Sequence, residues 1–127
     1  MTQTAPPILV VEDDPDLRLM LATALELDGR RVVTAINGRE GLRLAQIHRP
    51  ALIVLDLMLP IMSGEEMGAA LLGDDTLKPT PVIVVSARHD AEAVATRMHA
   101  AGCMLKPLSL EALVTLVNAT LSNRAAS

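Results

Sequence analysis

Short apolar runs along the chain alternate with longer segments in which apolar residues recur every three or four positions. Two of the runs, Ile8–Val11 and Val82–Val85, are rich in β-branched residues and show no polar alternation. This pattern is typical of strands that are covered on both faces of a sheet. The five strands that the pattern predicts are Ile8–Glu12, Arg31–Ala35, Ala51–Leu55, Val82–Val85 and Cys103–Leu105.

The segments between these runs carry the signals of helix ends. Asp14 followed by Pro15 is an N-cap with proline at the first helical position, and Gly29 marks the end of that helix. Ser109 is a suitable N-cap for the last helix, whose apolar residues have a 3.6-residue period as far as Leu121. The other three helices are expected from about Arg39 to His48, near Glu65–Leu72 and near Asp90–Ala101.

Five strand–helix units in series predict an α/β fold, because parallel strands need helical crossovers that cover both faces of the sheet. The 127 residues contain no internal repeat or linker, so we expect one domain over 1–127. Its core should span about 8–122, with flexible ends at 1–6 and 123–127. Half of the residues are apolar and a fifth are charged, which is typical of a folded globule.

Composition excludes several classes of protein. The net charge of −4 gives no reason to expect direct binding to nucleic acid. The single cysteine cannot form an internal disulfide, and neither a signal peptide nor an apolar run of membrane-spanning length is present. We therefore expect a cytoplasmic domain without a membrane anchor. The chain has no Phe, Tyr or Trp, so aliphatic residues and seven methionines must fill the core.

Charged and hydroxyl side chains gather where the predicted strands end. Glu12 and Asp13 end the first strand, Asp56 follows the third, Ser86 the fourth and Lys106 the fifth. The carboxyl ends of parallel strands meet at one edge of a sheet, which is where ligands bind in open α/β folds. We therefore expect these five residues to form one site.

The charges of this site favour a metal ion. Two carboxylates about 4 Å apart repel by roughly 4 kcal/mol at an effective dielectric constant of 20, so one lysine cannot balance three acids. Carboxylate oxygens suit Mg²⁺, which usually keeps several waters and often binds a substrate phosphate as well. Acids, an ammonium group and a metal together are typical of phosphoryl-transfer sites.

Four segments in this order, ILVVEDDP, LIVLDLMLPIMSG, VIVVSA and LKP, resemble the receiver domain of two-component response regulators. The resemblance extends from about Ile8 to Leu121, and its D-x-M-x-P-x-M-x-G run is highly specific. It implies a flavodoxin-like, doubly wound three-layer sandwich, like that of chemotaxis regulators. The five parallel strands would have the order 2-1-3-4-5, with five helices around them.

The family resemblance also implies a role for each site residue. Asp56 would accept a phosphoryl group from a histidine kinase or phosphotransfer protein, assisted by Ser86 and Lys106. Mg²⁺ would be held by Glu12, Asp13, Asp56 and the backbone carbonyl of Met58. The switch and modulating positions would be Ser86, Ala87, Arg88, Cys103 and Pro107, and the Lys106–Pro107 bond is usually cis in this family.

The resemblance further implies how the domain signals. The output face would be formed by the fourth helix, the fifth strand and the fifth helix. An effector domain or a downstream protein would read this face, and a phosphorylation-dependent dimer would be one route of output. The chain would catalyse only its own phosphorylation and dephosphorylation.

The chain departs from the family pattern before the lysine. Receivers usually have Tyr or Phe at the position of Cys103, and often Phe at that of Leu108. The interval from Ser86 to Lys106 is also about two residues shorter than usual. Either the loop after Gly102 is truncated, or the fourth helix loses its end and Cys103 takes the place of the aromatic residue. In both cases the aromatic half of the family's usual switch is missing, so we expect weakened or lost switching with the phosphorylation chemistry intact.

Three other functions compete with this interpretation. A receiver-fold interaction module that has lost its switch is the nearest alternative. A haloacid dehalogenase-like aspartyl-phosphate hydrolase needs a second aspartate two positions after the nucleophile, where this chain has Met58, and it also needs a cap domain. A flavodoxin-like FMN module is disfavoured because no phosphate-binding loop follows the first strand and no aromatic residue could stack on the flavin.

Overall fold

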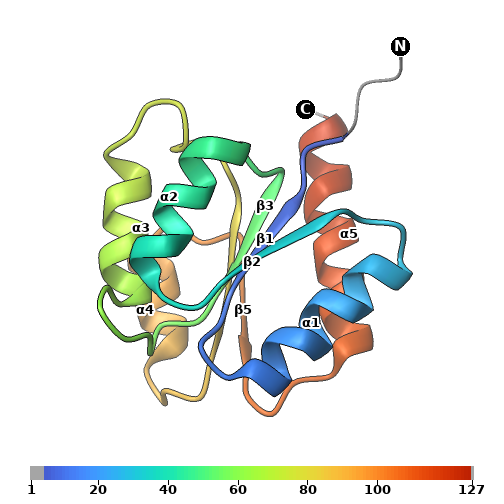
Figure 1. Cartoon of the computed structure of the whole chain (residues 1–127), viewed down its shortest axis with the longest axis horizontal. Coiled ribbons are helices and arrows are strands. Elements are labelled where there is room, and N and C mark those ends of the chain that lie inside the picture. The colour runs from blue at the N-terminus through green and yellow to red at the C-terminus, as the bar shows by residue number, and fades with distance from the viewer. Residues whose placement is uncertain (1–4, 127) are drawn as a thin grey trace.

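The order of strands and helices follows the predicted alternation (Figure 1). The structure is a computed structural model and describes residues 5–126. The strands are β1 (Ile8–Val11), β2 (Val32–Ala35), β3 (Leu52–Leu55), β4 (Val82–Ser86) and β5 (Gly102–Leu105). The helices are α1 (Pro15–Leu27), α2 (Gly38–His48), α3 (Gly64–Leu72), α4 (Ala91–Arg97) and α5 (Leu110–Ala126).

The five strands form one parallel sheet in the order β2-β1-β3-β4-β5, which confirms the predicted topology. Val11, the last residue of β1, lies opposite Leu55, the last residue of β3. Ser86 lies opposite Leu105 in the same way. The residues that follow these strand ends therefore meet at one edge of the sheet.

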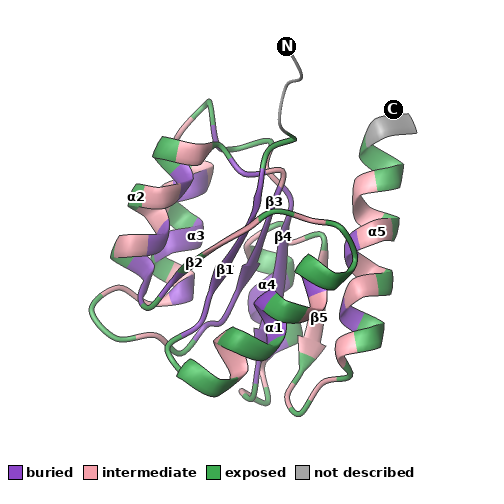
Figure 2. Ribbon diagram, turned by 45° about the vertical axis from the view of Figure 1, so that its right-hand side comes forward, coloured by how far each residue is buried: buried purple, intermediate pink, exposed green. Residues whose placement is uncertain are grey.

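Helices cover the sheet on both sides and make three layers. Helices α1 and α5 lie on one face, and α2, α3 and α4 lie on the other (Figure 1). Every residue of β1, β3 and β4 is buried, as the central strands in Figure 2 show. This confirms that the β-branched runs are strands covered on both faces.

Methionine takes part in filling a core that has no aromatic ring. Met67 of α3 is fully buried, and Met62 and Met98 pack against the same cluster. A Cβ atom added to Gly41 would lie 2.9 Å from the sulfur of Met67, so a glycine on α2 makes room for this side chain. The flexible methionine side chain suits such irregular gaps.

The predicted helix caps are present. The Asp14 carboxylate accepts hydrogen bonds from the backbone amides of Asp16 and Leu17, and Pro15 is the first residue of α1. The Ser109 hydroxyl accepts one from the amide of Ala112 at 3.1 Å. Gly29 has a φ of 90°, the left-handed conformation in which glycine is favoured after a helix end.

Helix α4 is shorter than the sequence predicts, because it ends at Arg97 and not near Ala101. The amide of Ala100 bonds the carbonyl of Ala95 at 2.9 Å, and His99 has a left-handed φ of 56°. Gly102 then opens β5, and Cys103 lies opposite Val84. Of the two readings of the shortened interval, the structure favours the loss of the helix end.

His99 in this left-handed position lets us predict a stabilising substitution. The left-handed conformation costs a residue with a Cβ atom about 1–2 kcal/mol, whereas glycine adopts it freely. His99→Gly should therefore raise the free energy of unfolding by about 0.5–1 kcal/mol, since the greater freedom of glycine in the unfolded chain offsets part of the gain. Urea denaturation measures the change.

The control is His48→Gly, in the last turn of α2, where glycine should cost about 0.5–1 kcal/mol. Equal losses in both variants would show that His99 is not strained.

Residues 1–4 and 127 lie outside the described residues, so the predicted flexibility there stays a prediction. Helix α5 continues to Ala126, beyond the expected core boundary. Within residues 5–126, no helix is both long and apolar enough to cross a membrane.

Candidate functional site

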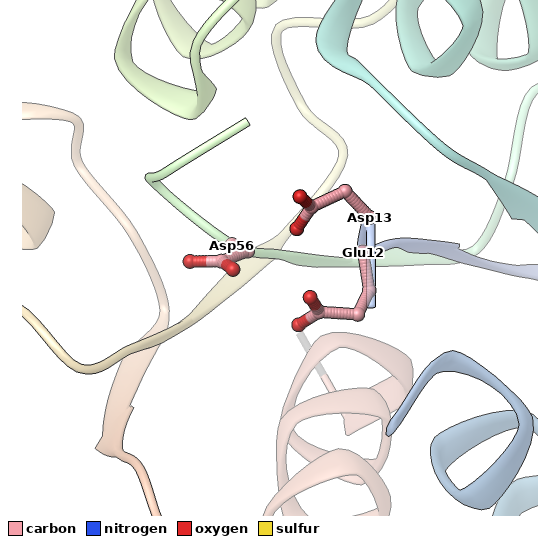
Figure 3. A group of neighbouring side chains, drawn as sticks. All are labelled: Glu12, Asp13 and Asp56. Atoms are coloured by element: carbon pink, nitrogen blue, oxygen red, sulfur yellow. The ribbon is translucent and has the colours of Figure 1, made fainter. Parts of the chain in front are cut away.

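Three acids from two neighbouring strands meet at the carboxyl edge of the sheet. Glu12 and Asp13 follow β1 and Asp56 follows β3, and one oxygen of each lies within 4.8 Å of the others (Figure 3). Glu12 and Asp56 are buried, with side chains 2% and 5% exposed, whereas Asp13 is exposed to solvent. The pairing of β1 with β3 thus brings these acids together, as the sequence predicts.

Lys106, which follows β5, reaches two of these acids. Its Nζ donates a hydrogen bond to Oδ2 of Asp56 at 2.8 Å. The same nitrogen makes an ion pair with Oε1 of Glu12 at 2.9 Å. One ammonium group thus bridges two buried carboxylates.

Burial and charge act in opposite directions on these groups. Burial raises the pKa of Glu12 and the nearby charge of Asp56 adds to this rise, although the contact with Lys106 lowers it in part. Burial alone would lower the pKa of Lys106, but Asp56 and Glu12 outweigh it and raise this pKa. Lys106 is therefore an ammonium group at neutral pH. Its single positive charge neutralises the pair formed by Glu12 and Asp56 only in part.

The acids of β1 are held by contacts that the sequence pattern did not identify. Arg18 on α1 donates hydrogen bonds from Nη1 to the backbone carbonyls of Glu12 and Asp13, at 2.9 and 3.3 Å. The amide of Asp14 bonds Oε2 of Glu12 at 3.1 Å. These bonds hold the loop between β1 and α1 in place. Nothing in the sequence predicts this role for an arginine in the first turn of a helix.

Asp56 is held from its other side by the loop that leads to α3. The amide of Met58 donates to Oδ1 of Asp56 at 3.2 Å, while Met58 as a whole is 61% exposed. Gly64 begins α3 against this loop, and its amide bonds the carbonyl of Leu57 at 3.0 Å. A Cβ atom on Gly64 would lie 2.1 Å from the backbone oxygen of Asp56, so only glycine allows this approach.

The predicted hydroxyl lies at the end of β4. Ser86 is fully buried, and its Oγ accepts a hydrogen bond from the amide of Arg88 at 3.2 Å. The Arg88 side chain makes ion pairs with Glu65 and Asp90, which sequence spacing did not reveal.

The remaining predicted positions are dispersed around this edge. Ala87 and Pro107 line a hollow beside Lys106, on the side of α1. The Lys106–Pro107 peptide bond is cis, as the family resemblance implies. Cys103 lies apart from the acids, half-buried against the cluster on the α2–α4 side, where burial raises the pKa of its thiol.

The residues present fit a hard divalent cation. Three carboxylates converge within 4.8 Å, and the two buried ones share a single ammonium group. All of these donors are oxygen atoms, which Mg²⁺ prefers, and one ammonium group leaves negative charge to be neutralised. This acidic triad is typical of the Mg²⁺ sites of receiver domains.

Comparison with known proteins agrees with the geometry. The family model of the response regulator receiver domain matches residues 8–118. The transcriptional regulatory protein PrrA of Mycobacterium tuberculosis is 38% identical over 123 residues, which are 95% of this chain and 52% of PrrA. The polar-differentiation response regulator DivK of Brucella anthropi is 33% identical over 122 residues, which cover 91% of this chain and 96% of DivK. This chain thus spans about half the length of PrrA but nearly all of DivK.

Solved structures show the same fold. The chemotaxis response regulator CheY4 of Vibrio cholerae superposes with a TM-score of 0.83 at 30% identity, over 91% of this chain and 98% of CheY4. The receiver domain of a signal transduction histidine kinase from Syntrophus aciditrophicus gives a TM-score of 0.85 at 31% identity, over 94% and 92% of the two chains. With its acidic pocket, its sheet order and its sequence in agreement, the chain belongs to the response regulator receiver domain family.

Proposed function

We propose that this chain is a phospho-accepting receiver domain, which takes a phosphoryl group from a histidine kinase or phosphotransfer protein onto Asp56 in an Mg²⁺-dependent reaction. The observation that carries the proposal is the pairing of a buried aspartate with an ammonium group beside two further acids. Lys106 holds Oδ2 of Asp56, and Glu12 and Asp13 lie within reach of the same carboxylate. A structural ion pair would need no additional acids.

The proposed step forms an acyl phosphate. A carboxylate oxygen of Asp56 forms a bond to phosphorus as the bond from phosphorus to the imidazole nitrogen of the donor breaks, and the electron pair leaves on that imidazole. Lys106 stays protonated and pairs with the phosphoryl oxygens. The Ser86 hydroxyl turns to donate a hydrogen bond to one of them. Water later hydrolyses the acyl phosphate, so the chain acts only on its own phosphoryl group.

Glu12, Asp13, Asp56 and the backbone carbonyl of Met58 would hold the metal. When bound, Mg²⁺ supplies neutralisation of the negative charge that the carboxylates and the phosphoryl oxygens share.

The output is proposed from the family and from PrrA. PrrA is a transcriptional regulatory protein, and this chain spans about half of its length. We infer that an effector domain or a downstream protein reads the α4-β5-α5 face, with a phosphorylation-dependent dimer as one route. We place the domain in the cytoplasm and expect no direct contact with nucleic acid or membrane.

One observation favours a second function, a receiver-fold interaction module with a weakened switch. Cys103 stands where receivers usually have an aromatic residue, and it is half-buried in β5. A switch needs a free-energy difference between its two states, and a thiol supplies much less buried surface than a ring. The hydrolase alternative loses its support, because the chain belongs to the receiver family.

The proposal is tested by phosphorylating the natural chain with acetyl phosphate in Mg²⁺ or in EDTA. We expect one phosphoryl group by intact mass in Mg²⁺, and peptide mapping should place it on Asp56. The adduct should survive acid and be lost in base, as acyl phosphates are. An adduct on another residue, or one that forms equally well in EDTA, would refute the assignment.

Removal of Asp13 should weaken metal binding. Asp13→Ala deletes one of three carboxylates that converge on one point, so we expect the affinity for Mg²⁺ to fall about tenfold or more, which is about 1.4 kcal/mol. Because the chain has no tryptophan, calorimetry or NMR titration is the measurement.

Asp16→Ala is the matched control for Asp13→Ala. It removes an equal charge from the exposed first turn of α1, and its affinity for Mg²⁺ should stay within about twofold of the natural chain. Equal binding by the Asp13 variant and the natural chain would show that the site lies elsewhere.

A further inference from the structure

Arg88 joins the loop after β4 to two helices. Its Nε and Nη2 atoms donate to the two carboxylate oxygens of Asp90, at 2.9 and 2.8 Å. Its Nη1 atom makes a close contact with Oε1 of Glu65, at the start of α3. The hydrogen bond from Arg88 also lowers the pKa of Asp90, which keeps that carboxylate charged. We call the three residues Glu65, Arg88 and Asp90 the Arg88 latch.

The main chain of the same arginine holds the site hydroxyl. The amide of Arg88 donates to Oγ of Ser86 at 3.2 Å, and Ser86 is fully buried. Arg88 also lines a hollow next to Asp13 and Met58, at the edge where Asp56 lies. Thus the side chain of one residue fixes the loop to α3 and α4, while its amide fixes Ser86.

We propose that the Arg88 latch holds Ser86 and the loop after β4 in the resting arrangement, and that it opens when a phosphoryl group is on Asp56. This inference rests on the proposed function. A phosphoryl oxygen draws the Ser86 hydroxyl away from the Arg88 amide. The loop can follow only if the guanidinium leaves Glu65, because Asp90 lies in the same segment and moves with it. The ion pair with Glu65 therefore stabilises the resting state alone, and phosphorylation has to act against it.

The Arg88 latch also determines which helices respond to phosphorylation. Glu65 directly follows Gly64, whose amide bonds the carbonyl of Leu57 next to Asp56. Opening of the latch frees the start of α3 and the start of α4 together. A domain with Cys103 in place of an aromatic ring thereby has a charged connection from the site to these two helices.

The strength of the latch is set by its exposure. The side chains of Arg88, Glu65 and Asp90 are 30%, 41% and 37% exposed, so water screens the ion pairs in part. Interactions that exist only in the resting state reduce the fraction of molecules in the active state. The apparent affinity for a ligand that binds only the active state falls by the same factor. For a partly exposed network we expect this factor to be about three to ten.

The test is a titration with beryllofluoride in Mg²⁺, followed by NMR or calorimetry on the whole chain. Beryllofluoride is the probe because it mimics a phosphoryl group on a carboxylate. Glu65→Gln and Arg88→Gln should each bind it about three to ten times more tightly than the natural chain. Arg88→Lys keeps the charge but not the paired contacts, so its affinity for beryllofluoride should lie between that of these two variants and that of the natural chain. Glu92→Gln, which removes an exposed charge from the same turn of α4, is the matched control and should stay within about twofold.

The variants separate the latch from other roles of Arg88. If Arg88 bound the phosphoryl group itself, Arg88→Gln would weaken beryllofluoride binding while Glu65→Gln strengthened it, and the latch would be wrong. Unchanged affinity in both variants would also overturn it. If the natural chain bound no beryllofluoride, and Asp56→Asn behaved in the same way, the proposed function would fail and the latch with it.

A second measurement needs no phosphoryl group. In the free protein, Glu65→Gln should shift the amide resonances of Ser86 and Arg88, and Glu92→Gln should not. An unaffected Ser86 resonance would show that the ion pair between Arg88 and Glu65 has no influence on the Ser86 hydroxyl.

Discussion

Replacing Asp56 with asparagine should abolish phosphorylation by acetyl phosphate and leave the chain folded. An amide oxygen is a poor nucleophile, so no acyl phosphate can form at this position. The fold should persist because the asparagine oxygen can still accept the hydrogen bond from the Met58 amide. Lys106 also keeps its second partner, Glu12, at 2.9 Å. Intact mass measures the adduct, and urea denaturation measures the stability.

The control for Asp56→Asn is Asp75→Asn, which neutralises an exposed aspartate in the loop after α3. This variant should take up one phosphoryl group like the natural chain. A base-labile phosphoryl group that survives in Asp56→Asn would mean that another carboxylate is the nucleophile. Loss of the adduct in both variants would instead point to a general effect of charge on the donor.

The site could be predicted because parallel strands place their carboxyl ends together. Glu12, Asp56 and Lys106 are far apart in the sequence, yet each follows an apolar run that only a buried strand explains. Once the runs are aligned in one sheet, the three residues lie at the same edge. Because β4 lies between β3 and β5, it is the long side chain of Lys106 that completes the contact. The residues at the strand ends were enough to predict an acidic site suited to phosphoryl transfer. The order of the strands, in contrast, was predicted from the family resemblance.

Partners of surface charges could not be predicted in this way. Arg88 and Glu65 are 23 residues apart, and neither position shows a period or motif that relates them. Several acids would satisfy an arginine equally well in solution, and only the tertiary structure selects one. Arg18 is similar, since its partners are backbone carbonyls and leave no trace in the sequence.

The end of α4 at Arg97 could not be predicted from the sequence for a different reason. The segment after Arg97 is rich in alanine and favours a helix. The amide of Ala101, however, bonds the carbonyl of Val82 at 2.7 Å and so begins the pairing of β5 with β4. The short interval before Lys106 forces the chain to leave the helix early. Here sheet closure outweighs local propensity.

Gly64→Ala should lower the free energy of unfolding by about 3 kcal/mol or more, the upper range for overpacking a site that cannot relax. The new Cβ atom would lie 2.1 Å from the backbone oxygen of Asp56 and 2.7 Å from Cα of Leu57. Both are main-chain atoms at the end of a central strand, so no side chain can turn aside to make room. The midpoint of urea denaturation should fall accordingly.

Gly73→Ala is the control that isolates this contact. Gly73 ends the same helix with an ordinary φ of −82°, and the nearest atoms to an added Cβ lie 3.6 Å away. Its effect on stability should stay within about 0.5 kcal/mol. A comparable loss in both variants would attribute the effect to helix α3 in general. A large loss at Gly64 alone, together with slower phosphorylation by acetyl phosphate in the fraction that folds, would show that Gly64 positions the Asp56 carboxylate by letting α3 begin against its backbone.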